Sequence, residues 1–139
     1  MRYFIDTHIF VFLCRDHDEL SRNVRELVLD YENTLVMSVE SVRELLMLIN
    51  NGKVQSKDLK SYDDIKEKMQ KYGIKIRHTS DTHLETLSRL IPVARHSDPA
   101  DLMIIAQAIT EKIPLISSDT KFPLYTRHGL DFIFNDRTK

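Results

Sequence analysis

The chain has 139 residues, 29% of them charged and 42% hydrophobic, with a formal net charge of −1. This is the composition of an ordinary globular protein, and the near-zero net charge by itself gives no indication of binding to nucleic acid. No run of about 18 apolar residues exists, which excludes a transmembrane helix, and Asp6 interrupts the apolar stretch that a signal peptide needs. With one cysteine, Cys14, and therefore no internal disulfide, we expect a reducing compartment, the cytoplasm, and a single domain over residues 1–139.

In the first half of the chain, short apolar segments alternate with helical patterns. Tyr3, Phe4 and Ile5 favour a strand over residues 2–5 that ends at Asp6. The following segments predict a helix from residues 9–13, a helix capped by Ser21, a strand over 34–37, and a helix that Ser38 or Ser41 caps and that runs to about residue 49.

The second half repeats this alternation. It predicts a helix over residues 59–72 that Gly73 ends, a strand over 74–77, a helix over 80–90 that Pro92 breaks, a helix from Asp98-Pro99 to about residue 112, and strands over 114–117 and 130–134. Short strands alternating with helices indicate an α/β protein. We therefore predict a three-layer α/β/α sandwich with a central, mainly parallel sheet.

Four acidic residues follow strands or begin helices in this scheme. They are Asp6, Glu44, Asp101 and Asp119. Because helix N-termini and strand C-termini share one edge of an open α/β sheet, we expect all four at that edge. Each also has a structural explanation: Asp6 as a helix cap, Glu44 in a capping box with Ser41, Asp101 favouring a helix dipole, and Asp119 as a turn residue.

Four carboxylates in one place need compensation. Two of them about 4 Å apart repel by roughly 4 kcal/mol at an effective dielectric constant of 20, so a protein tolerates such a group when some members are protonated or a cation lies among them. Ligands that offer oxygen alone suit Mg²⁺ or Mn²⁺, and no histidine or cysteine has the spacing of a zinc site. Such an ion would polarise a phosphoryl oxygen and lower the pKa of a water, which is the chemistry of phosphodiester hydrolysis.

The segments around these acids resemble the successive motifs of PIN-domain nucleases, most closely those of VapC-type toxins of prokaryotic toxin–antitoxin operons. In order, they read IDTHIFVFL, MSVESVRELL, HSDPADLMIIAQA and ISSDTKF. The resemblance implies an α/β/α fold, a divalent-metal site, and cleavage of single-stranded RNA to 3′-hydroxyl and 5′-phosphate ends. It also implies a small cognate antitoxin. We further expect a homodimer and no membrane association.

By the same resemblance, Asp6, Glu44, Asp101 and Asp119 match the metal-binding acids of the family. Asp98 matches an acid of one subgroup, where it supports the ligands or only caps the helix. Ser117 stands where the family commonly has threonine, and a hydroxyl is retained there.

Several basic residues lie near these acids in the sequence. Arg43 and Lys121 could contact RNA phosphate or could pair with acids at the rim, and His96 could contact phosphate or lie in a surface loop. His8 is also expected near the site. The remaining histidines, which we expect at the surface, are His17, His78, His83 and His128. The apolar stripe formed by residues 42, 45, 46 and 49 is expected to form core or a dimer contact.

Three other functions compete with a toxin nuclease. An aspartyl phosphotransferase also begins with a strand that ends in aspartate, but it needs a second acid nearby where this chain has His8, and it needs a lysine at a strand end. A non-catalytic binding module should lack one of the acids, and here all are present. A nuclease that processes RNA without being a toxin stays open, as do the RNA target, the number of metal ions and the size of the oligomer.

Overall fold

The computed structural model describes residues 1–93 and 98–137. Within these residues, strands form one parallel sheet in the order β3-β2-β1-β4-β5. The strands are β1 (Arg2–Ile5), β2 (Thr34–Ser38), β3 (Lys75–Arg77), β4 (Leu115–Ser117) and β5 (Phe132–Phe134). The order reverses at β1, which lies between β2 and β4. Such a reversal opens a crevice at the carboxyl ends of the strands, where ligands bind in open α/β sheets.

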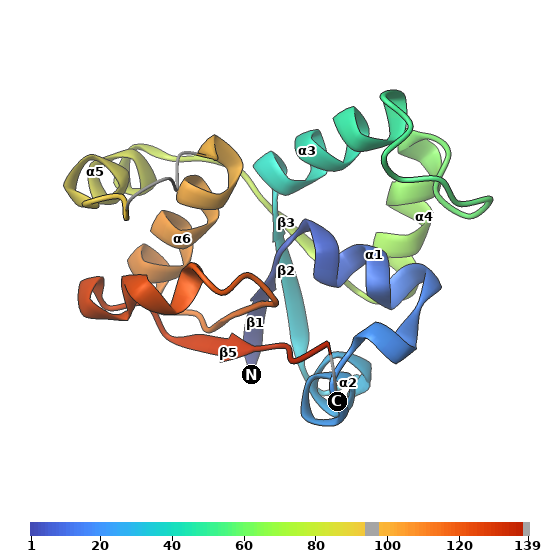
Figure 1. Ribbon diagram of the computed structural model, residues 1–139, viewed down its shortest axis with the longest axis horizontal. Coiled ribbons are helices and arrows are strands. Elements are labelled where there is room, and N and C mark those ends of the chain that lie inside the picture. Colours follow the sequence, from blue (N-terminus) through green and yellow to red (C-terminus); the bar gives the residue numbers. More distant parts are fainter. Residues whose placement is uncertain (94–97, 138–139) are drawn as a thin grey trace.

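Helices cover both faces of this sheet (Figure 1), with α5 and α6 on one side and α1 and α4 on the other. The helical segments are α1 (Thr7–Arg15), α2 (Arg22–Leu29), α3 (Val39–Asn50), α4 (Tyr62–Lys71), α5 (Asp81–Arg89) and α6 (Pro99–Glu111), with 3₁₀ turns η1 (His17–Glu19) and η2 (Phe122–His128). The three-layer α/β/α prediction is therefore confirmed. None of the helices in the described residues is long and apolar enough to cross a membrane.

Alternating strand residues build two apolar clusters, one on each face. Tyr3 and Ile5 pack into a cluster with α1, α2, α3 and α4, whereas Phe4 packs into a second cluster with α6 and η2. Successive side chains of a strand point to opposite faces, so a sheet covered on both sides needs continuously apolar strands. The apolar stripe of α3 contributes to the first cluster, with Val42 and Leu45 buried and their neighbours partly buried, so its expected core role is confirmed.

The structure differs from the sequence prediction at several helix ends. The helix predicted over residues 59–72 begins only at Tyr62, because Ser61 caps it by accepting a hydrogen bond from the Asp64 N–H at 3.3 Å. The 3₁₀ turns η1 and η2 were not predicted. Helix α3 begins after Ser38, whose hydroxyl accepts from the Glu40 N–H at 3.1 Å. Ser41 therefore lies inside the helix, and the capping-box explanation of Glu44 is wrong.

Candidate active site

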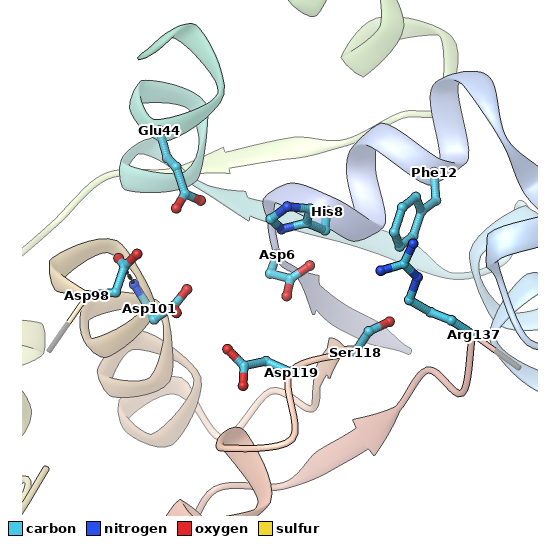
Figure 2. Close-up of a pocket in the computed structure, with 9 residues that line it drawn as sticks. All are labelled: Asp6, His8, Phe12, Glu44, Asp98, Asp101, Ser118, Asp119 and Arg137. Atoms are coloured by element: carbon cyan, nitrogen blue, oxygen red, sulfur yellow. Dashed lines mark hydrogen bonds between the residues drawn. The ribbon is translucent and has the colours of Figure 1, made fainter. Parts of the chain in front are cut away.

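Five carboxylates surround one cavity of about 260 Å³ at the carboxyl edge of the sheet (Figure 2). We call it the acidic pocket. Its lining residues are Asp6, His8, Phe12, Glu44, Asp98, Asp101, Ser118, Asp119 and Arg137. They come from the start of α1, the middle of α3, the start of α6, the loop after β4 and the segment after β5. The structure thus brings the four predicted acids together with Asp98, as the parallel topology requires.

Asp6 lies at the centre of the pocket (Figure 2), directly after β1. One carboxylate oxygen, Oδ1, caps α1 by accepting from the Ile9 N–H at 2.9 Å, and the other, Oδ2, accepts from the Ser117 hydroxyl. The residue is 8% exposed. Burial raises the pKa of Asp6, against the lowering effect of its hydrogen bonds with Ser117 and Ile9. Asp6 is both a cap and a pocket residue.

Asp98 and Asp101 occupy the first turn of α6. Asp98 is the N-cap, and its Oδ1 accepts from the N–H groups of Ala100 at 2.9 Å and Asp101 at 3.2 Å. Burial and then the negative charge of Asp98, followed by those of the other three acids, raise the pKa of Asp101 to about 8. A helix N-terminus favours negative charge, yet burial and the neighbouring carboxylates outweigh that effect on the pKa of Asp101. The cap expected at Asp98 is present, and the same side chain lines the pocket.

Glu44 and Asp119 are held by hydroxyl and backbone groups. The Thr7 hydroxyl donates to Glu44 Oε1, which fixes this α3 side chain against the start of α1. The Asp119 N–H donates to the Ser117 hydroxyl oxygen at 3.0 Å, and Asp119 Oδ1 accepts from the Lys121 N–H at 2.8 Å. Ser117, fully buried, therefore connects Asp6 with Asp119 through its hydroxyl.

A subset of these acids has the geometry of a cation site. One carboxylate oxygen from each of Glu44, Asp98 and Asp101 lies within 4.8 Å of the other two. The donors are all oxygen, which suits a hard divalent ion such as Mg²⁺ or Mn²⁺. Asp98 belongs to this closer set, whereas Asp6 and Asp119 lie farther along the same pocket (Figure 2).

Sequence reasoning missed three residues that line the pocket: Phe12, Ser118 and Arg137. His8 was expected there, and it lies two residues after Asp6. Phe12 follows His8 by one helical turn on α1, a spacing that puts the two side chains on one helix face, and their rings are 6.3 Å apart. Arg137 lies far from the motifs in sequence and gave no local signal.

The predicted phosphate-binding residues have mixed outcomes. Arg43 pairs with Glu40 at the surface and lines a neighbouring groove with Glu44 instead of the acidic pocket. Lys121 is the N-cap of η2 and lies two residues after Asp119. His96 lies outside the described residues.

The surface prediction for His83 is wrong, because this side chain is 3% exposed. Its Nδ1 accepts from the Ser80 N–H at 3.1 Å, so Nε2 carries a proton and donates to Glu111 Oε2 at 2.7 Å. Arg77 Nε lies 3.1 Å from Glu111 Oε1. We call Arg77, His83 and Glu111 the histidine cluster. It joins α5 and the end of β3 to α6.

Comparisons with known proteins agree with this fold. The family model described as PIN domain matches residues 3–127. No curated protein sequence matches the chain closely. Among solved structures, it is similar to VapBC2 from Rickettsia felis bound to a promoter DNA fragment (TM-score 0.67, 21% identity, 98% of this chain and 100% of that chain). It is also similar to VapBC-1 from nontypeable Haemophilus influenzae (TM-score 0.66, 20% identity, 100% of both chains). A third similar structure is VapBC-5 from Mycobacterium tuberculosis, a member of the VapBC family of toxin–antitoxin systems (TM-score 0.59, 14% identity, 96% and 97%).

Proposed function

The chain belongs to the PIN-domain family, and we propose that it is a Mg²⁺-dependent endoribonuclease, the toxin of a type II toxin–antitoxin pair. The observation that carries this proposal is the convergence of five carboxylates on one pocket at the carboxyl edge of the sheet. Burial and then the repulsion among these carboxylates raise the pKa of Asp101, and such an arrangement is costly for a protein that uses the acids only as helix caps.

In this proposal, Glu44, Asp98 and Asp101 hold the ion, with Asp6 and Asp119 completing the site from the strand ends. Hydrogen bonds around these acids support fixed positions, because the Ser117 hydroxyl donates to Asp6 and accepts from the Asp119 N–H. Mn²⁺ would substitute for Mg²⁺ because both accept oxygen ligands. When bound, the ion supplies Lewis-acid polarisation of a phosphoryl oxygen and a more acidic water.

The proposed reaction is hydrolysis of a phosphodiester bond of RNA. The water oxygen bonds to phosphorus as the bond from phosphorus to the 3′ oxygen breaks, and the 3′ oxygen takes up a proton. The products are a 3′-hydroxyl and a 5′-phosphate. Asp6 and Asp101 hold protons more readily than ordinary carboxyls, and a cation among them reverses that tendency and favours the carboxylate.

The toxin assignment draws on the solved VapBC structures to which the chain is similar over nearly its whole length. We accordingly propose a cognate antitoxin as partner, a homodimer as the assembly, and the cytoplasm as the compartment. Arg43 and Lys121 remain candidates for contacts with RNA phosphate. An RNA-processing nuclease that is not a toxin shares the same pocket, and a non-catalytic module would share only the fold.

Cleavage assays test the nuclease. The purified protein should cleave single-stranded RNA with Mg²⁺ or Mn²⁺, should stop with EDTA, and should leave 5′-phosphate ends that a phosphate-dependent exonuclease degrades. Cleavage that persists in EDTA would contradict the metal mechanism. No cleavage with either ion would favour the non-catalytic module.

Expression in a bacterial host tests the toxin. Wild-type protein should arrest growth, whereas Asp101→Ala at equal abundance should not. A harmless, well-expressed and RNA-cleaving wild type would assign the chain to RNA processing instead.

A further inference from the structure

Arg137 brings a fixed positive charge to the acidic pocket. Among the described residues that line this pocket, it is the one lysine or arginine. It lies beyond residue 127, where the match to the family model ends, so the family resemblance assigns it no role. Contacts of the neighbouring backbone and of the side chain itself determine where Arg137 lies.

The segment that carries Arg137 is anchored two residues earlier by Asn135, which is completely buried. The Asn135 N–H donates to the Ser117 carbonyl at 2.8 Å, and its Oδ1 accepts from the Ser21 N–H at 2.7 Å. Its Nδ2 donates to the Glu19 carbonyl at 2.9 Å and to the Ser118 hydroxyl at 2.7 Å. A buried amide with every hydrogen-bonding group engaged fixes a backbone firmly. The chain therefore leaves β5 in a set direction, toward the pocket.

The side chain of Arg137 is also held. Its Nε donates to Glu19 Oε2 at 2.6 Å, and its guanidinium carbon lies 4.9 Å from the centre of the Phe12 ring. The side chain is 53% exposed, and these two contacts orient one edge and one face of its planar group. No hydrogen bond to either terminal amino group, Nη1 or Nη2, exists among the described residues.

Figure 2 shows where this remaining edge points. The guanidinium lies beneath Phe12 with an amino nitrogen directed toward His8 and Asp6, while Asp98 and Asp101 lie at the opposite end of the pocket. A paired amino edge is the part of arginine that matches two phosphate oxygens. Side chains of both signs thus occupy the two ends of one cavity, with Asp6 between them.

We propose that Arg137 binds a phosphate of the RNA backbone and thereby positions the strand across the carboxylates, an inference that rests on the proposed ribonuclease function. A polyanion that approaches five carboxylates is repelled unless cations lie on its path. The ion compensates one end of the pocket, and Arg137 compensates the other. The segment after β5 then forms part of the substrate site.

Steady-state kinetics with a short single-stranded RNA test this role. Arg137→Gln should raise KM about tenfold, the loss of one charge-assisted contact, with a smaller change in kcat. Arg137→Lys keeps the charge but loses the paired amino groups of the guanidinium, so its KM should lie between those of wild type and Arg137→Gln. The matched control is Arg22→Gln, which removes the same charge from a side chain that is 94% exposed and pairs with Glu26, and it should behave as wild type.

Salt dependence distinguishes a phosphate contact from a structural one. Binding of fluorescently labelled RNA is measured at several salt concentrations in the cleavage-deficient Asp101→Asn protein, with and without Arg137→Gln. Loss of one phosphate contact should reduce the slope of log K against log salt by about 0.7. Thermal melts of the same proteins report any loosening of the segment.

The outcomes separate this inference from the function on which it rests. Wild type that cleaves RNA, together with unchanged KM and salt slope in Arg137→Gln, would overturn the role of Arg137 alone. A lower melting temperature with an unchanged slope would also overturn it and make Arg137 an anchor for Phe12 and Glu19. If wild type cleaves no RNA, the ribonuclease proposal fails, and the binding slopes still decide whether Arg137 contacts phosphate.

Discussion

The acidic pocket and the histidine cluster are both groups of polar side chains, but their charges are matched in different ways. In the histidine cluster, the Glu111 carboxylate accepts from His83 and pairs with Arg77. In the acidic pocket, five carboxylates line one cavity with a single arginine among the described residues, Arg137, which pairs with Glu19 instead of with them, and the pKa of Asp101 is raised to about 8. The first group is compensated by its own chain, whereas the second needs protons or an external cation. Charges without a partner in the chain are typical of a binding site, whereas the charges of a structural contact are paired.

The largest difference should appear in catalysis. Asp6→Asn should lower the initial rate of RNA cleavage by about 100-fold or more, because a charge at the centre of the site is lost. Asparagine can still cap α1, so folding is preserved and circular dichroism should be unchanged. Glu111→Gln, the same change in the histidine cluster, should cleave within about twofold of wild type. Comparable losses in the two variants would erase the distinction between the regions.

Stability should depend more on the histidine cluster than on the acidic pocket. Glu111→Ala should lower the free energy of unfolding by about 1–3 kcal/mol, because His83 loses its acceptor in a buried position. Denaturant titration measures this loss, and His83→Ala provides a second route to the same contact. An unfolding midpoint equal to that of wild type would mean that the histidine cluster contributes nothing to the packing of α5 on α6.

Metal binding sharpens the contrast further. Mg²⁺ at tenfold its dissociation constant should stabilise the wild type by about 1.4 kcal/mol, and it should stabilise Glu111→Ala equally. In Asp119→Asn, the response should be much smaller, while the melting temperature in EDTA should rise because one repelling charge is gone. Thermal melts with EDTA and with Mg²⁺ measure both. Equal Mg²⁺ responses in wild type and Asp119→Asn would separate Asp119 from the ion.

A further difference concerns the pH dependence of stability. The pKa of Asp101 rises from 3.8 to about 8 in the folded protein, so the folded state holds a proton that the unfolded state releases between these values. This contribution to stability is complete below about pH 4 and is lost as the pH rises through 8. In EDTA, the wild type should therefore lose more stability between pH 5 and pH 8 than Asp101→Asn does. Parallel curves would show that Asp101 ionises normally.

The sheet and the convergence of the acids could be predicted from the sequence because both depend on short apolar strand segments and on the general arrangement of parallel strands. Apolar strand segments near residues 4, 36 and 116 are short and bounded by polar residues, and parallel strands bring their carboxyl ends to one edge. Asp6 and Asp119 follow from this rule directly. Glu44 does as well, although Ser41 offered it a competing local explanation that the cap at Ser38 removes.

What the sequence could not predict depends on contacts between distant segments. His83 looked like a surface histidine because its acceptor, Glu111, lies in another helix. Arg137 reaches the pocket through Asn135, whose partners include Ser21 and Ser118. The spacing of residues within one segment cannot predict these contacts of Asn135, because they form only after β5 has joined the sheet.

The central position of β1 has a consequence for folding kinetics. This first strand pairs with β2, but it also pairs with β4, so that Phe4 lies beside Leu115. Closing so long a loop is entropically costly, and non-local parallel pairing is slow. Asp6 meets Asp119 only when that pairing forms, whereas the turns of α3 and α6 can form early. During refolding, the helical signal should therefore recover before Mg²⁺ binding, and the proposed nuclease activity should return only when this slow pairing is complete.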